Sequence, residues 1–184
     1  MIDESLISAH NGTNFVIEKV TKKDENDNDY TISEFKYKQD VIHNKFNSVK
    51  EAQIYIGECD GCSHFNESKN QFTDVTWGDV LYLGLYMGLT PEYIYSNKTH
   101  SIDVVESDQE IIDYVTWINN NINVIQHDEW TYVTSKKYDI IICDLWAEPD
   151  DIIQDHKTKL INNYTNNLKD GGKIIIPISG ETIN

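Results

Sequence analysis

Four stretches of the chain place glycines or acidic residues directly after a short apolar run. The first is DVLYLGLYMGLTPEYI (79–94), in which Gly84 and Gly88 lie between the apolar run and the start of a helix. Glycines in such a turn let the backbone approach a nucleotide-like ligand closely. Glu106 ends the second run, roughly 20 residues after the glycines, where a carboxylate accepts hydrogen bonds from both hydroxyls of a ribose. These two features together indicate a nucleoside site.

The other two stretches add acids and aromatic rings. The third run is followed by QHDEW (126–130), which offers an acid, Asp128 or Glu129, to an adenine amino group and an aromatic ring to its face. The fourth run ends in CDLW (143–146), with Asp144 directly after the run. A strand-final acid often caps the next helix, so each feature alone is weak. Their occurrence in chain order, at the spacing of successive strand–helix units, favours a single ligand site.

These residues must be positioned by alternating strands and helices, which begin at about residue 78. Strands are expected at 80–83, 101–107, 122–126, 138–144 and 173–178, and helices after Thr90, over 109–117 and over 157–168, with Asp170-Gly171-Gly172 ending the last one. This pattern predicts an α/β fold: a Rossmann-like, mostly parallel, doubly wound sheet, truncated after the fifth strand. In such sheets a ligand lies beyond the carboxyl ends of the strands, at the switch in strand order.

Residues 1–77 have a different pattern, in which short runs of alternating apolar and polar residues are separated by polar turns. Candidate strands are 14–20, 30–38, 40–46 and 52–58, with a charged loop at 22–29. The expected organisation is a small antiparallel β region of hairpins (1–77), followed by the Rossmann-like domain (78–184). Cys59 and Cys62 form a CxxC pair, but no second pair follows to complete the four ligands of a structural metal. Since Asp60-Gly61 is a strong hairpin turn, the cysteines are expected to flank that turn, and no metal site is predicted.

Composition restricts the partners. The 184 residues are 39% hydrophobic and carry a formal net charge of −16, which repels nucleic acid and anionic lipid and attracts cations. No segment approaches the ~18–20 apolar residues of a membrane span, and the first residues lack a signal-peptide pattern. A cytoplasmic protein is therefore expected. The abundance of Asn, Ile, Lys and Asp fits an AT-rich genome, including that of a virus whose protein acts in the host cytoplasm.

The segment from about 78 to 178 resembles the class I S-adenosylmethionine-dependent methyltransferase fold, and within it the spermidine-synthase-like branch. The matching stretches are VLYLGLYMG, IDVVESD, VIQHDEW, YDIIICDLW and LKDGGKIIIPI. They span a little over half of the chain. The motif VVESD is more similar to the corresponding motif of the polyamine synthases than to that of many methyltransferases. The resemblance implies S-adenosylmethionine, or its decarboxylated form, as cofactor, and methyl or aminopropyl transfer to a small, amine-containing acceptor.

Carried over by position, the resemblance also implies roles for individual residues. It assigns Gly84, Leu85, Tyr86 and Gly88 to the methionine part of the cofactor, Glu106 to the ribose with Ser107 or Asp108 beside it, and Asp128 with Glu129 to the adenine. Asp144 matches the acid that, in spermidine synthases, orients the attacking amine and takes its proton. Trp146 and Glu148 are expected to contact the acceptor, and the acids of 146–151 would suit a cationic amine.

The chain departs from the family pattern in three ways. Tyr86 replaces the middle glycine of the turn, and its side chain must either cover the ligand or block the pocket. Glu148 is a displaced substitute for the second acid after the fourth strand, which weakens the case for a polyamine. Residues 180–184 leave no room for the family's final β-hairpin, so the fifth strand is expected to have an exposed edge that an oligomer would bury.

Two other classes of function fit the same residues. One is a module that binds adenosylmethionine or its thioether products without chemistry, as a sensor or regulatory subunit. The other is an acidic decoy that binds basic partners, with the fold as a scaffold only. A thiol-dependent or metal-dependent enzyme that uses Cys59 and Cys62 ranks last.

Overall fold

The computed structural model describes residues 7–37, 59–60, 77–95, 99–145, 150–176 and 181–183. The chain divides into two units, one of Met1–Glu67 with Ala147–Pro149, the other of Ser68–Trp146 with Asp150–Asn184. The predicted boundary at residue 77 stays a prediction, because residues 61–76 lie outside the described part. Within that part, no helix is long and apolar enough to cross a membrane.

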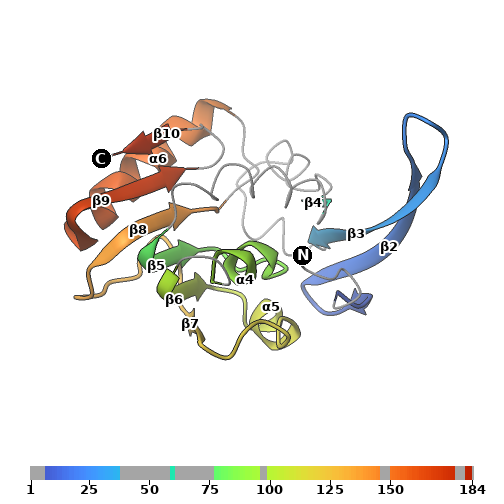
Figure 1. Ribbon diagram of the computed structural model, residues 1–184, viewed down its shortest axis with the longest axis horizontal. Helices are drawn as coiled ribbons and strands as arrows, with labels where there is room; N and C mark the ends of the chain where they lie inside the picture. Colours follow the sequence, from blue (N-terminus) through green and yellow to red (C-terminus); the bar gives the residue numbers. More distant parts are fainter. Residues whose placement is uncertain are drawn as a thin grey trace. The chain divides into compact units, whose positions relative to one another are not determined.

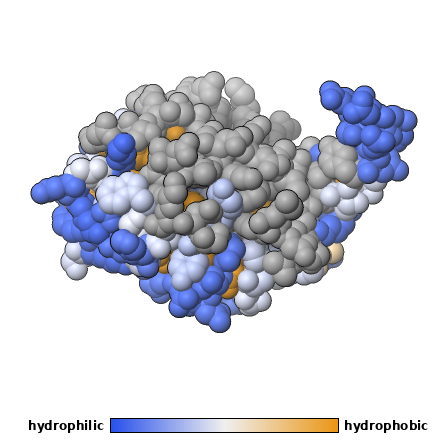
Figure 2. Space-filling view, in the orientation of Figure 1, coloured by the Kyte–Doolittle hydropathy of each residue, from blue (hydrophilic) through white to orange (hydrophobic). Residues whose placement is uncertain are grey.

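The first unit contains an antiparallel sheet with the strand order β1-β2-β3-β4. Its strands are β1 (His10–Asn11), β2 (Phe15–Lys23), β3 (Asp29–Tyr37) and β4 (Cys59–Asp60). The Asp24 carboxylate closes the turn between β2 and β3 by accepting the backbone N–H groups of Asn26 and Asn28, both at 2.9 Å. This hairpin confirms the expected strands at 14–20 and 30–38, and its turn is hydrophilic throughout (Figure 2). The strands expected at 40–46 and 52–58 lie outside the described residues.

The second unit contains a six-stranded sheet with the order β10-β9-β8-β5-β6-β7 (Figure 1). Its strands are β5 (Gly78–Leu83), β6 (Thr99–Glu106), β7 (Ile122–Gln126), β8 (Tyr138–Cys143), β9 (Leu168–Ile176) and β10 (Glu181–Ile183). The first five pair in parallel, and the strand order reverses between β5 and β8. These five strands confirm the predicted fold class, and the reversal places the expected ligand site beyond the ends of β5 and β8.

Helices cover both faces of this sheet, because alternate residues of its strands are apolar on opposite sides. The helices are α4 (Leu89–Tyr95), α5 (Gln109–Tyr114) and α6 (Asp150–Tyr164), followed by a 3₁₀ turn over Thr165–Asn167. Leu81 and Leu83 of β5 pack in one buried cluster with Leu160 and Tyr164 of α6. Tyr82, between those leucines, points to the opposite face, where its hydroxyl meets the side chain of Thr90 in α4.

The region around α6 and β9 differs from the prediction. The helix covers 150–164 instead of 157–168, and Asp170-Gly171-Gly172 lies inside β9 instead of ending the helix. The ladder between β8 and β9 shifts register from Tyr138↔Leu168 to Ile140↔Lys173, so β9 carries extra residues there. A Cβ on Gly172 would lie 3.0 Å from the carbonyl oxygen of Tyr138. The glycine therefore allows a close backbone approach in a bulged strand.

The edge of the fifth strand also differs from the prediction. β10 pairs antiparallel with β9, with Glu181 opposite Ile176 and Ile183 opposite Ile174. A single short strand, Glu181–Ile183, therefore pairs with the edge of β9, so the expectation that this edge is exposed is wrong. One strand of three residues is not the family's final β-hairpin, and the expected absence of that hairpin stays a prediction. Over Ile174–Ile176 the backbone of β9 is paired within the chain, which removes the reason given above for an oligomer through an exposed edge.

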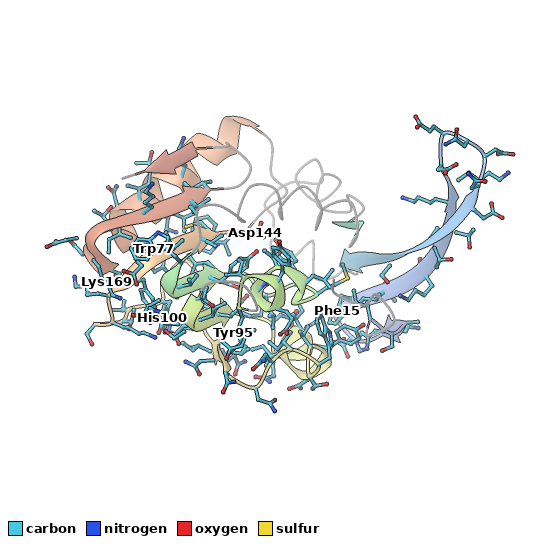
Figure 3. All side chains as sticks on the ribbon, in the orientation of Figure 1. Phe15, Trp77, Tyr95, His100, Asp144 and Lys169 are labelled. Atoms are coloured by element: carbon cyan, nitrogen blue, oxygen red, sulfur yellow. The ribbon has the colours of Figure 1, made fainter. Side chains whose placement is uncertain are left out.

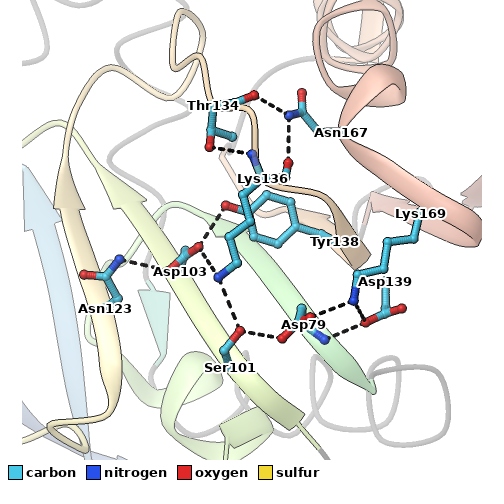
Figure 4. Close-up of polar contacts among 10 residues, drawn as sticks. All are labelled: Asp79, Ser101, Asp103, Asn123, Thr134, Lys136, Tyr138, Asp139, Asn167 and Lys169. Atoms are coloured by element: carbon cyan, nitrogen blue, oxygen red, sulfur yellow. Dashed lines mark hydrogen bonds and ion pairs between the residues drawn. The ribbon is translucent and has the colours of Figure 1, made fainter.

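A network of hydrogen bonds and ion pairs joins the amino ends of the strands (Figure 4). Lys169 lies 2.6 Å from Asp79 and 2.7 Å from Asp139. In its other half, Asp103 accepts hydrogen bonds from Lys136 and Tyr138, both at 2.8 Å. The network fixes this edge of the sheet, and it lies at the opposite strand ends from Asp144, as the positions of Lys169 and Asp144 show (Figure 3).

Candidate functional site

The turn after β5 joins the neighbouring strand ends. The backbone N–H of Gly84 donates to the carbonyl of Val105 in β6 at 2.9 Å. Gly84 has φ +94°, and a Cβ there would lie 2.4 Å from the carbonyl oxygen of Asp144. Only glycine allows β5 and the chain after β8 to approach this closely. The turn and Asp144, 60 residues apart in the sequence, are therefore in direct contact.

The second glycine has a different role. Gly88 has φ +71°, and a Cβ there would lie 2.4 Å from Val115 and 2.8 Å from Ile118. Its lack of a side chain lets the start of α4 pack against the chain that follows α5. Gly88 thus supports helix packing at this end of the sheet, and nothing in its contacts requires a ligand.

Tyr86 has a backbone conformation that is typical of glycine. Its φ is +46°, in the left-handed region that residues with a Cβ enter at a cost of about 1–2 kcal/mol. Its ring is half-buried and folds back over the turn, because its Cε2 atom lies 3.3 Å from the position of a Gly84 Cβ. The side chain therefore lies on the turn itself, at the place where a ligand would meet the backbone.

Glu106 is the most strongly held acid at the carboxyl end of the sheet. The residue is only 4% exposed, and its Oε2 accepts the backbone N–H of Leu85 at 3.0 Å. Its Oε1 accepts the N–H of Asp108 at 2.8 Å. The Ser107 hydroxyl is a third, more distant donor, 3.5 Å from Oε1. A carboxylate has about four acceptor positions, so these three contacts leave room for one further donor, and for a second if it takes the place of the Ser107 hydroxyl. The carboxylate is thus fixed between the glycine turn and the start of α5.

Ser107 and Asp108 follow Glu106 with unequal roles. The Asp108 side chain accepts the backbone N–H of Glu110 at 2.9 Å and caps the N-terminus of α5. Ser107 is exposed, and its backbone N–H donates to the carboxylate of Glu129 at 3.0 Å. Its hydroxyl lies 3.5 Å from Oε1 of Glu106. Ser107 therefore lies at the surface between the two acids, whereas Asp108 belongs to the helix cap.

The two acids predicted to face adenine lie in different environments. Glu129 is buried, and besides accepting from Ser107 it accepts the Tyr164 hydroxyl on its backbone carbonyl at 2.5 Å. Asp128 is exposed, and its Oδ1 accepts the backbone N–H of Trp130 at 2.8 Å. Glu129 thus ties the end of β7 to β6 and α6, and Asp128 is the acid that remains at the surface.

Asp144 lies at the carboxyl end of β8, next to the glycine turn. It is 7% exposed, and its backbone N–H donates to the carbonyl of Leu83 at 3.1 Å. Its carboxylate accepts the hydroxyl of Tyr82, which is 1% exposed. Burial raises the pKa of Tyr82 well above its ordinary value and Asp144 raises it further, whereas a hydrogen bond with Thr90 lowers it. Tyr82 therefore stays protonated and acts as the donor.

Tyr82 is the site residue that the sequence reasoning missed. In VLYL it reads as one more member of a buried strand. Its signal is a hydroxyl two residues before Gly84, between the apolar residues Val80, Leu81 and Leu83. A buried hydroxyl needs a partner, so its position implied an acceptor near the turn.

The cysteines show no sign of a catalytic role in the part of the chain that the structure describes. Burial raises the pKa of the Cys143 thiol, and Asp144 raises it further, so this cysteine is a packing residue rather than a nucleophile. Cys59 lies in β4, opposite Phe35 of β3. Cys62, Trp146 and Glu148 lie outside the described residues.

The structure thus brings Gly84, Leu85, Glu106, Ser107 and Asp144 together at one edge of the sheet. Neither a protein-family model nor a curated protein sequence matches the chain. Among solved structures, the chain is similar to the plantazolicin methyltransferase BpumL in complex with a monoazolic desmethylPZN analog and SAH (TM-score 0.52, 18% identity, covering 74% of this chain and 56% of that one). It is also similar to the DhpI-SAM-HEP complex (TM-score 0.50, 14% identity, covering 69% and 58%).

The chain therefore spans less than two thirds of the length of each of these structures. At such low identity, the likeness concerns the fold and not the chemistry. Together with the strand order, it shows that the second unit shares the Rossmann-like fold of these methyltransferases.

Proposed function

We propose that this chain binds S-adenosylmethionine, or its decarboxylated form, and transfers a methyl or aminopropyl group from it to a small amine. The observation that carries the proposal is Glu106. Its carboxylate accepts two backbone N–H groups and lies 3.5 Å from the Ser107 hydroxyl. It would accept two hydroxyl donors if one of them took the place of the Ser107 hydroxyl. A ribose supplies two adjacent hydroxyls, and the glycine turn lies next to this carboxylate.

Other residues at the same edge of the sheet would contact the remaining parts of the cofactor. Gly84, Leu85 and Tyr86 would contact its methionine part, with Gly88 supporting the turn from behind. Asp128 would accept from the adenine amino group, and the buried Glu129 would hold Ser107 and the loop in place. These assignments fit the donors and acceptors present, and adenosylmethionine supplies an activated carbon on a positively charged sulfur.

The chain's own contribution to the reaction would be position. Asp144 lies against the glycine turn, and we assign it the orientation of the attacking amine and the acceptance of its proton. In-line placement of amine and carbon would supply most of the remaining rate, because the sulfonium is a good leaving group. Trp146 and Glu148 stay the proposed contacts to the acceptor, in a spermidine-synthase-like arrangement.

A second candidate function is favoured by Tyr86. Its ring lies on the turn where the ligand would meet the backbone, so it can also narrow the site to ligands with a smaller methionine end. In that case the chain is a binding module for adenosyl thioethers, with no transfer. The acidic decoy predicts no affinity for any adenosyl compound and salt-dependent binding to cationic proteins instead.

One experiment separates these functions. Calorimetric titration of the full chain with adenosylmethionine, its decarboxylated form, adenosylhomocysteine and methylthioadenosine should show binding of at least one sulfonium compound. Mass spectrometry of the chain with that compound and a set of amines should then show a transferred group. Binding of thioethers only would support the module, and binding of none of the four would overturn the proposal.

A further inference from the structure

The pair formed by Tyr82 and Asp144 carries a further inference about the candidate site. The two residues come from the adjacent strands β5 and β8, at the point where the strand order reverses. Both side chains are buried, and the phenol donates its hydrogen bond to Oδ2 of the carboxylate. A buried carboxylate is costly unless donors stabilise its charge, and Tyr82 supplies one.

Three contacts fix Asp144 to the strand that leads into the glycine turn. Its backbone N–H donates to the carbonyl of Leu83, its own carbonyl oxygen touches Gly84, and its carboxylate accepts from Tyr82. The three partners of Asp144 are the consecutive residues Tyr82, Leu83 and Gly84. A substitution at any of them should therefore move the Asp144 carboxylate relative to the turn. Such a carboxylate cannot rotate freely to follow a ligand.

The third member of the arrangement is Thr90, whose side chain hydrogen-bonds to Tyr82 from α4. It orients the phenol from the opposite side, so that the Tyr82 proton is directed at Asp144. The neighbouring Cys143 carries no charge here, since burial raises the pKa of its thiol. The phenol of Tyr82, which donates to the negatively charged Asp144 at the turn, is itself neutral, because its pKa is raised well above the ordinary value.

We infer that Tyr82 is a positioning residue that holds Asp144 as a fixed negative charge, so that this site binds a cofactor with a positively charged sulfur more tightly than its neutral thioether product. This inference rests on the proposed function, because it requires an adenosyl ligand at the site. A charge at short range in a desolvated site interacts strongly with a sulfonium and weakly with a thioether. The arrangement would retain the reactive cofactor and favour release of the spent product.

The test compares the dissociation constants of adenosylhomocysteine and adenosylmethionine by calorimetry and uses no acceptor. The quantity compared is the dissociation constant of adenosylhomocysteine divided by that of adenosylmethionine. In the parent protein we expect this ratio to be greater than one. Asp144→Asn should reduce the ratio about tenfold or more, since the charge is lost. Tyr82→Phe should reduce it about three- to tenfold, the net effect of losing one ordinary hydrogen bond, because the charge itself stays on Asp144. The double variant should show no further reduction beyond Asp144→Asn, because Tyr82 acts through Asp144.

A matched control is available in the same sheet. Tyr138 is also fully buried, and its hydroxyl also donates to a buried aspartate, Asp103, at 2.8 Å, but at the amino ends of the strands. Tyr138→Phe should therefore lower the melting temperature as Tyr82→Phe does, and leave the ratio of dissociation constants unchanged.

Two results would overturn the inference while the proposed function stands. One is a parent protein that binds both ligands equally well. The other is a Tyr82→Phe variant that weakens both ligands by the same factor, which would make Tyr82 a structural residue only. If the parent protein binds only decarboxylated adenosylmethionine, the same comparison is made between that compound and its thioether product, methylthioadenosine. A parent protein that binds none of the four adenosyl compounds would instead overturn the proposed function, and this inference with it.

Discussion

The carboxylate of Glu106 accepts the backbone N–H of Leu85 at 3.0 Å, which joins the carboxyl end of β6 to the turn after β5. The same carboxylate also accepts the N–H of Asp108 at the start of α5. Two loops that are distant in sequence are therefore held by a single side chain, before any ligand is present. A ligand that bonds to Glu106 meets an acceptor that is already in place, and this reduces the entropy lost on binding.

Glu106→Gln should weaken adenosylmethionine binding about tenfold or more, because neutral hydrogen bonds replace charge-assisted ones of about 1.5–3 kcal/mol each. Calorimetry measures this directly. Asp103→Asn is the matched control, since Asp103 is a buried acid of the same strand whose partners Lys136 and Tyr138 lie at the opposite edge. The Asp103→Asn variant should be less stable than the parent protein but should bind adenosylmethionine with the same affinity. Equal affinities of Glu106→Gln and the parent would show that Glu106 does not contact the ligand.

Gly84→Ala should destabilise the protein far more than Gly171→Ala. Both glycines have positive φ, +94° and +78°, so both substitutions carry a backbone cost of about 1–2 kcal/mol. A Cβ on Gly84 would also lie 2.4 Å from the Asp144 carbonyl oxygen, whereas nothing lies within 4 Å of one on Gly171. Urea unfolding of the two variants measures the difference, and similar losses of stability would contradict the close approach of the turn and Asp144.

Tyr86→Gly should be more stable to urea than Tyr86→Ala by about 1 kcal/mol. Both substitutions remove the same ring, but alanine must still adopt the left-handed φ of +46°, which glycine adopts without cost. The comparison therefore isolates the backbone conformation from the loss of packing. If Tyr86→Ala were the more stable variant, residue 86 would not have a positive φ in solution.

The ion pairs of Lys169 should make stability depend on pH. A hydrogen bond from Lys169 is the main cause of the lowered pKa of Asp79. Burial alone would raise the pKa of Asp139, but Lys169 and the Asp79 backbone N–H lower it overall from the ordinary 3.8. Since both acids are stronger in the folded protein, their contribution is complete above about pH 5 and is lost as the pH falls below 3.8.

Lys169→Met should therefore lower the melting temperature at pH 7, where Asp79 and Asp139 would repel each other, and lower it much less at pH 3, where both take up protons. Thermal unfolding followed by circular dichroism at several pH values tests this. The control is Lys137→Met, because Lys137 donates to the backbone carbonyl of Asn166 and not to a carboxylate. A loss that is independent of pH in Lys169→Met would exclude the ion pairs as its cause.

The five parallel strands could be predicted because each contains a short apolar run, and in the inner strands β5 and β8 that run is buried on both faces of the sheet. The acids after them could be located for the same reason, since a strand has a defined end. The strand β10 could not, because its three residues form a strand only through pairing with β9, a long-range contact without a local pattern. The Asp170-Gly171-Gly172 segment was misassigned because glycines end helices and also permit strand bulges.

The candidate site was predictable as a set of residues, but the division of roles within it was not. Asp128 and Glu129 are adjacent acids, and the sequence gives no sign that Glu129 is the buried one that bonds to Ser107. Tyr82 looked like an apolar strand residue, because its contribution depends on Asp144 from another strand. These roles follow from which strands become neighbours, which is a property of the whole sheet.

The contact between Gly84 and the carbonyl oxygen of Asp144 constrains one position more than the other. Any side chain at residue 84 would displace the end of β8, whereas the atom that it would meet is a backbone oxygen, which every residue type at position 144 supplies. In relatives that keep this approach of β5 and β8, residue 84 should therefore remain glycine even where the side chain after β8 has changed.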